Sequence, residues 1–82
     1  MRLTLYGHEY CHLCHEMLEA LAPMQRRYRF EVKWIDIEGC EELEARFGER
    51  VPVLMAGDEE ICHHVLDPAA VLQRFNLSGK AL

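Results

Sequence analysis

Two cysteines three residues apart, Cys11 and Cys14, are the residues best placed in this chain to do chemistry. They follow a short apolar run, residues 3–6, and lie where a strand is expected to pass into a helix. If a helix starts near Cys11, then Cys14 lies one turn further along the same face, so the two sulfurs can form a disulfide. Unpaired backbone N–H groups at the positive end of the helix would favour a thiolate at Cys11, the species that attacks disulfides.

Three kinds of chemistry fit this stretch. A redox dithiol predicts an exposed nucleophile at Cys11 and a more buried resolving thiol at Cys14. A zinc or iron–sulfur site would need further ligands. The remaining candidate ligands are His12, His15, Cys40, Cys62, His63 and His64. Residues 11–15 also satisfy the C-x-x-C-H rule for covalent haem attachment, a short pattern that chance often matches.

Length and composition limit the chain to one small domain, residues 1–82. Half of the 82 residues are hydrophobic, which is enough for one compact core without disulfides. Residues 1–6 are too short for the apolar core of a signal peptide, and no apolar run approaches the length of a membrane span. We therefore expect a cytoplasmic protein with no membrane partner.

A cytoplasmic location bears on the choice between the three kinds of chemistry. Thiols in that compartment are mostly kept reduced, so four cysteines favour catalysis or metal binding over a structural disulfide framework. The same argument disfavours haem attachment, because c-type haem proteins are exported. The formal net charge of −5 argues against a nucleic acid partner. The basic cluster at residues 26–29 is typical of the end of a helix.

The first half of the chain predicts a strand, a helix and a second strand. Residues 2–6 read as a strand, followed by a turn at residues 7–9. Apolar residues then recur at helical spacing; they are Leu13, Met17, Leu21, Met24 and Tyr28. Pro23 predicts that this helix is kinked there, or ends and restarts. Residues 30–37 form the next strand, expected to be parallel to the first because a helix of crossover length separates them.

The second half predicts a helix, a hairpin and a last helix. Residues 40–47 form a short helix with Cys40 at its start, closed by Gly48. A third strand covers residues 50–55 with a proline near its start, and a tight turn at 56–59 joins it to a strand at 60–62. Asp67 and Pro68 open the last helix, which is expected to run through Phe75. Residues 76 onward are expected to fray, leaving a tail at 77–82.

With this β-α-β-α-β-β-α order, the chain resembles the thioredoxin-fold superfamily and, within it, the small glutaredoxin-like proteins. The stretches that carry the resemblance are residues 3–6, 11–14 and 50–54. The resemblance implies an α/β fold, a four-stranded mixed sheet with helices on both faces. It also implies a cis bond between Val51 and Pro52, with the backbone of Val51 offered to an extended peptide or glutathione beside Cys11.

Two departures from typical glutaredoxins affect the expected substrate. Those proteins have Pro-Tyr between the cysteines, where this chain has His12 and Leu13. They also have a Gly-Gly-x-x-Asp stretch after the fourth strand, where this chain has residues 62–67 with side chains in place of the glycine pair. Glutathione is a conceivable co-substrate, but these side chains argue against the close backbone approach that it needs.

We predict a thiol-disulfide oxidoreductase in which Cys11 is the nucleophile and Cys14 resolves the mixed disulfide. The expected substrate-binding residues are Val51, Pro52, His12, Cys62 and His63. His12 is either close enough to the Cys11 sulfur for its protonated ring to favour the thiolate, or a solvated residue without effect.

The expected partners are a disulfide-containing protein or small-thiol substrate and a reductase that supplies electrons. The protein is expected to be a monomer with no bound metal or cofactor. The alternative from a different functional class is a metal or iron–sulfur binding module that uses Cys11 and Cys14 together with Cys62 or His63.

Overall fold

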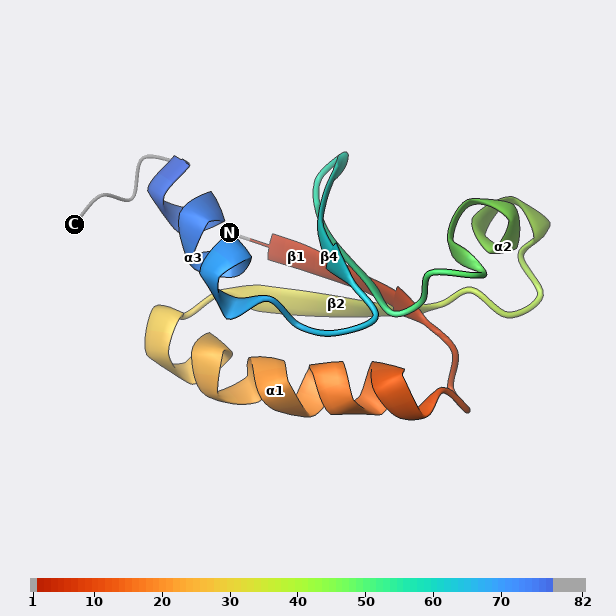
Figure 1. Cartoon of the computed structure of the whole chain (residues 1–82), viewed down its shortest axis with the longest axis horizontal. Helices are drawn as coiled ribbons and strands as arrows, with labels where there is room; N and C mark the ends of the chain where they lie inside the picture. The colour runs from red at the N-terminus through yellow and green to blue at the C-terminus, as the bar shows by residue number, and fades with distance from the viewer. Residues whose placement is uncertain (1, 78–82) are drawn as a thin grey trace.

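The structure, a computed structural model, describes the backbone of residues 2–77 and the side chains of residues 2–74. The elements follow one another as β1 (Arg2–Gly7), α1 (His12–Tyr28), β2 (Glu31–Asp36), α2 (Glu41–Phe47), β3 (Val53–Ala56), β4 (Glu59–His63) and α3 (Pro68–Leu77) (Figure 1). This is the predicted β-α-β-α-β-β-α order. The predicted tail at 77–82 falls, beyond Leu77, outside the described residues.

The four strands form one mixed sheet in the order β2-β1-β3-β4. β1 and β2 are parallel, as predicted from the helix between them, and Gly7 lies opposite Asp36. β3 is antiparallel to both β1 and β4. Figure 1 shows α2 near the end of the sheet where β1 finishes, the end at which α1 begins, and α3 toward the opposite end. The dithiol therefore lies at the carboxyl end of the central parallel pair.

Alternating side chains of the strands build two hydrophobic clusters, which place helices on both faces of the sheet. The first cluster, on the side of α1 and α3, contains Leu3, Leu5, Met17, Leu21, Phe30, Leu54, Ala56 and Val71. The second, on the side of α2, contains Ile37, Phe47, Val53 and Met55, with Tyr6, Leu43 and Val51 packed against it. The fold class predicted from the sequence is therefore confirmed.

Of the two outcomes predicted at Pro23, a kink or a break in the helix, the structure excludes the break. The helix is assigned continuously from His12 to Tyr28 with Pro23 inside it. Leu21 is fully buried and Met24 packs against the same cluster, so tertiary contacts on both sides of the proline hold the helical path. Arg29 ends the helix in the left-handed conformation, at a φ of 58°, and its N–H donates to the Gln25 carbonyl.

Other element boundaries differ from the prediction by a few residues. Gly7 is the last residue of β1 instead of the start of a turn, because it pairs with Asp36 across the sheet. β3 begins only at Val53, after the proline. α3 extends to Leu77, so Asn76 is helical instead of frayed. The side chain of Phe75, predicted to share a face with Val71, lies outside the described ones.

The turn and cap signals in the sequence behave as predicted. Gly57, at a φ of 62°, lies in the tight turn between β3 and β4, where a left-handed residue is needed. Asp67 caps α3, since its carboxylate accepts a hydrogen bond from the Ala70 N–H at 3.2 Å. Cys40 precedes α2 as expected, although its side chain makes no capping bond. No helix among the described residues is long and apolar enough to cross a membrane.

Candidate active site

The two thiols are held by the start of α1. Cys11 is the residue before the helix, with extended backbone, and its sulfur accepts a hydrogen bond from the Cys14 N–H at 3.2 Å. Cys11 therefore caps the helix with its own sulfur, and a backbone donor points at the atom where negative charge would develop. Cys11 is partly exposed and Cys14 is fully buried, and both are free thiols. The predicted difference in exposure is confirmed.

Gly7 leaves the space that the Cys14 side chain fills. A Cβ atom at position 7 would lie 2.7 Å from the Cys14 sulfur and 2.9 Å from the tip of the Trp34 ring. Real Cβ atoms essentially never come so close to another atom, so only glycine fits here without a shift of its neighbours. The end of β1, the buried thiol and the single tryptophan of the chain therefore meet at one point.

Burial raises the pKa of the Cys14 thiol from 9.0 to about 12. The hydrogen bond that this thiol makes with Cys11, and the negative charges of Cys11 and Asp36, act in the same direction, while a hydrogen bond from the His8 backbone opposes them. Cys14 is consequently a neutral thiol at physiological pH. Its thiol makes a hydrogen bond with the Cys11 sulfur.

The histidines around the dithiol have partners of their own. His12 forms an ion pair with Glu16 at 2.8 Å, and its side chain is 87% exposed. Its placement resembles the solvated first-turn residue more than a partner of the Cys11 sulfur. His15 is exposed, as predicted, but its ring nitrogen lies 2.6 Å from the Glu9 carbonyl and its ring stacks against Trp34. His15 therefore ties the turn before the dithiol to β2, a role that spacing alone did not indicate.

The bond between Val51 and Pro52 is cis, as the resemblance implied. Pro52 is buried and Val51 packs against the second cluster. Because Tyr6 pairs with Val53, the start of β3 lies at the same sheet end as the finish of β1, from which the chain runs into the dithiol. Among the described residues, the backbone of Val51 makes no hydrogen bond.

The end of β4 adjoins the cis proline. His64 donates its backbone N–H to the Pro52 carbonyl at 2.8 Å and has a left-handed backbone with a φ of 67°. Its ring nitrogen lies 3.2 Å from the Glu49 carbonyl. His64 therefore joins the residues after β4 to both sides of the Val51–Pro52 loop. The sequence marked His64 as a candidate ligand, but its left-handed backbone and its contacts with this loop were not predicted.

Cys62 and His63, the last two residues of β4, contact residues of the sheet and of the hairpin. Cys62 lies opposite Leu54 and is partly buried; burial raises its pKa, although a hydrogen bond from the Asp67 backbone opposes this. His63 contacts the Glu60 carboxylate at 2.6 Å and meets His64 edge to face. Burial acts to raise the pKa of Glu60, but hydrogen bonds from His63 and Arg50 outweigh it, so the net shift is downward.

The ligand set of the metal alternative is not gathered in this structure. Among the described residues, the one group of three or more candidate ligands within 4.8 Å of one another is His8, Asp36 and Glu38. Cys62 and His63 do not join Cys11 and Cys14 in such a group. The three residues at the ends of β1 and β2 are partly or fully exposed, and the spacing argument did not single them out.

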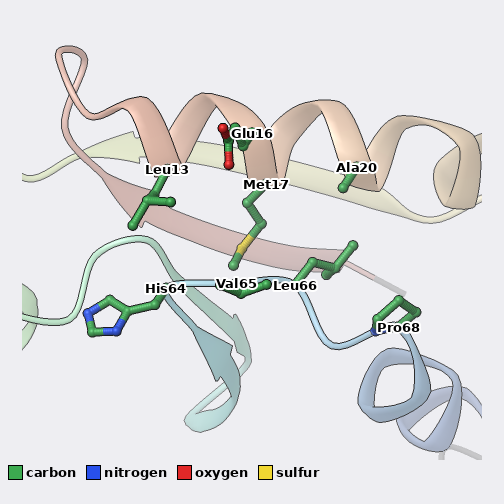
Figure 2. A pocket seen from close by; sticks show the side chains of 8 residues that line it. All are labelled: Leu13, Glu16, Met17, Ala20, His64, Val65, Leu66 and Pro68. Atoms are coloured by element: carbon green, nitrogen blue, oxygen red, sulfur yellow. The ribbon is translucent and has the colours of Figure 1, made fainter.

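A groove opens along the first half of α1, between that helix and the segment that joins β4 to α3 (Figure 2). Its volume is about 230 Å³. The residues that line it are Leu13, Glu16, Met17, Ala20, His64, Val65, Leu66 and Pro68. Figure 2 shows Leu13 and Met17 pointing from the helix toward the opposite wall. Sequence reasoning missed this groove, because no spacing rule indicates that Ala20 on α1 lies across from Val65 after β4.

Comparisons with known proteins agree with the geometry. The family model described as "Glutaredoxin-like domain (DUF836)" matches residues 2–76. Protein Ne2328 from Nitrosomonas europaea has a similar structure, with 41% identity, a TM-score of 0.82, and coverage of 89% of this chain and 88% of its own. Protein XcR50 from X. campestris has 32% identity and a TM-score of 0.72, covering 92% of this chain and 96% of its own.

A more distant structure shares the fold alone. Thioredoxin 1 from Thermosipho africanus TCF52B has 15% identity and a TM-score of 0.64, covering 96% of this chain and 99% of its own. No curated protein matches the chain. Since the family model covers nearly the whole sequence, the chain belongs to the glutaredoxin-like family, and its fold is that of thioredoxin.

Proposed function

We propose that this protein is a thiol-disulfide oxidoreductase that reduces disulfides through Cys11 and Cys14. The observation that supports this most directly is the helix cap, in which the partly exposed Cys11 sulfur accepts the Cys14 N–H while the Cys14 thiol is buried behind it. One sulfur is open to a substrate and receives a backbone hydrogen bond, and the other is withheld from solvent. Membership of the glutaredoxin-like family supports redox activity in general.

The reaction has two steps that conserve atoms and electrons. The Cys11 thiolate attacks one sulfur of the substrate disulfide, which forms a mixed disulfide and releases the first substrate thiolate. Cys14 then transfers its proton to the released substrate thiolate, directly or through solvent, and attacks the Cys11 sulfur, which releases the second substrate thiolate and leaves a disulfide between Cys11 and Cys14. Two electrons pass from the dithiol to the substrate, and a reductase or a small thiol must return them.

The environment of Cys14 separates these steps. While Cys11 is a thiolate, its charge and hydrogen bond help burial to hold the proton on Cys14. Once Cys11 has joined the substrate, that charge is gone and one cause of the raised pKa disappears. Cys14 therefore becomes a better nucleophile only after the mixed disulfide has formed.

Substitution of each thiol tests the division of labour. Cys11→Ser should abolish reduction of a disulfide substrate, because the thiol of the dithiol that remains, Cys14, is buried. Cys14→Ser should lose turnover but accumulate a mixed disulfide, visible as an added mass in intact-protein mass spectrometry. Equal alkylation rates of the two thiols in the reduced protein, with the same loss in both variants, would contradict the assignment. Zinc or iron in stoichiometric amount after anaerobic purification would favour the metal-binding alternative.

The electron donor is expected to be a reductase of the thioredoxin-reductase type instead of glutathione. When the Gly-Gly-x-x-Asp pattern is aligned on Asp67, His63 and His64 have the positions at which typical glutaredoxins carry two glycines, and His63 is held there by Glu60. Side chains at these positions oppose the close approach of the glutathione backbone. Millimolar glutathione with glutathione reductase should therefore recycle the oxidised protein at least about tenfold more slowly than it recycles a typical glutaredoxin. Comparable rates would show that these side chains do not exclude glutathione.

A further inference from the structure

The groove beside the dithiol continues along the whole of α1. A second hollow of about 350 Å³ shares Ala20, Leu66 and Pro68 with the first. The residues that only this second hollow adds are Pro23, Met24, Arg27, Tyr28 and Leu72. The two hollows therefore adjoin along α1, the first reaching Leu13, which lies between the two cysteines in the sequence, and the second reaching Tyr28 at the other end of the helix. We treat them together as one groove.

Three of the four exposed large hydrophobic side chains of the described residues lie along this groove. Leu13 is 40% exposed, Val65 69% and Tyr28 37%, and each lines the groove. The fourth, Tyr10, is 86% exposed and immediately precedes Cys11. Exposed apolar residues scattered singly need no explanation, but a row that begins at a reactive sulfur marks a binding surface.

Residues 64–66, which form the side of the groove opposite α1, are held in place by hydrogen bonds before any partner binds. His64 is hydrogen-bonded to the Pro52 and Glu49 carbonyls, and the next residue, Val65, donates its N–H to the His63 carbonyl at 2.7 Å. Figure 2 shows residues 64–66 facing Leu13 and Met17 across the groove. A wall held in this way loses little conformational entropy on binding, which favours affinity.

The length and the charges of the groove restrict its occupant. From position 13 to position 28, an α-helix rises about 22 Å, whereas a tripeptide such as glutathione spans about 10 Å when extended. At the far end, Arg27 lies 5.6 Å from the centre of the Tyr28 ring and makes no ion pair within the described part of the chain. Near the dithiol, Glu16 is already paired with His12. An occupant with an acidic group at the far end would complement Arg27.

We propose that this groove binds an extended, largely apolar segment of a protein disulfide substrate, about six residues long, with an acidic side chain paired to Arg27. This rests on the proposed function, because the segment is the one adjoining the substrate cysteine that Cys11 attacks. The groove would raise the rate of the first step for protein disulfides and leave small disulfides unaffected.

The test uses disulfides that release a coloured thione when Cys11 attacks them. The protein is the full chain with Cys14→Ser, so that only the first step is observed. The probes are ten-residue apolar peptides that each carry a single cysteine, activated as the 2-pyridyl disulfide, at one end and Asp or Lys at the other. Each peptide is made in both orientations, with the cysteine at the N-terminus or at the C-terminus. The comparison probe is 2-hydroxyethyl 2-pyridyl disulfide. Ala20→Arg fills the middle of the groove, and Ala45→Arg makes the same change on the exposed surface of α2.

Ala20→Arg should lower the second-order rate constant for at least one Asp peptide about tenfold or more. Its rate constant for the small disulfide should stay within about twofold of that of the parent. Ala45→Arg should change neither rate constant. Arg27→Glu should reverse the preference for the Asp over the Lys peptide, and Arg26→Glu, one residue away and outside the groove, should not. An equal loss for peptide and small disulfide, or no loss for either peptide orientation, would overturn the proposal. So would a dimer that Ala20→Arg dissociates, because a second copy would then fill the groove. Failure of the parent to react with the small disulfide would refute the proposed function itself.

Discussion

Cys11 and Cys14 are chemically identical side chains held in different states by the groups around them. Cys11 receives a backbone hydrogen bond at the start of a helix, whereas Cys14 is enclosed by Gly7, Trp34 and the helix itself. The difference in exposure follows from the spacing, since a helix that begins after Cys11 turns Cys14 toward the sheet. The depth of that burial could not be predicted, because it depends on a glycine and a tryptophan that are distant in sequence.

The buried thiol should make the stability of the reduced protein depend on alkaline pH. The pKa of Cys14 is raised in the folded state from 9.0 to about 12, so folding favours the protonated thiol. The resulting stability is fully present below about pH 9 and is lost as the pH rises toward 12. The free energy of unfolding of the reduced protein, measured with urea at pH 8, 9, 10 and 11, should therefore fall more steeply with pH than that of Cys14→Ala. Parallel curves for the two proteins would contradict the prediction.

Among the elements, β1 does more than lead into the dithiol, because its last residue is part of the site. The sequence predicted the strand and placed Gly7 in a turn, since glycine before a cysteine pair commonly marks one. The structure keeps Gly7 in the sheet, paired with Asp36, with the Cys14 sulfur against its Cα hydrogens. A glycine is required both where a neighbouring side chain packs closely and where a turn needs conformational freedom. A single sequence cannot distinguish these two reasons.

Gly7→Ala should therefore destabilise the protein by overpacking. The added methyl group would lie under 3.0 Å from both the Cys14 sulfur and the Trp34 ring, so we expect a loss of about 1–3 kcal/mol in the free energy of unfolding, measured by urea denaturation. Trp34→Leu removes one of the two close contacts. In a double-mutant cycle, the cost of Gly7→Ala should consequently be smaller in the Trp34→Leu background. An alanine variant as stable as the parent would show that the Cys14 side chain moves freely.

On the scale of the whole molecule, the predicted order of elements, the parallel pairing of β1 and β2 and the two-faced sheet are all present. The apolar residues of α1 show what could not be predicted, namely which of them are buried. Its spacing marks Leu13, Met17, Leu21 and Tyr28 alike as core, but only the middle two are buried. Periodicity identifies which face of a helix is apolar. How much of that face is buried depends on the position of the segment between β4 and α3.

The meeting of Gly7, Cys14 and Trp34 has a practical consequence. Trp34 is the chain's one tryptophan, and the tip of its ring lies against the same point of β1 as the resolving sulfur. Sulfur quenches indole emission at short range, and a thiol and a disulfide quench to different extents. The protein therefore contains its own optical probe of the dithiol, so that oxidation and reduction can be followed in real time, without a label, by the intrinsic fluorescence of a single residue.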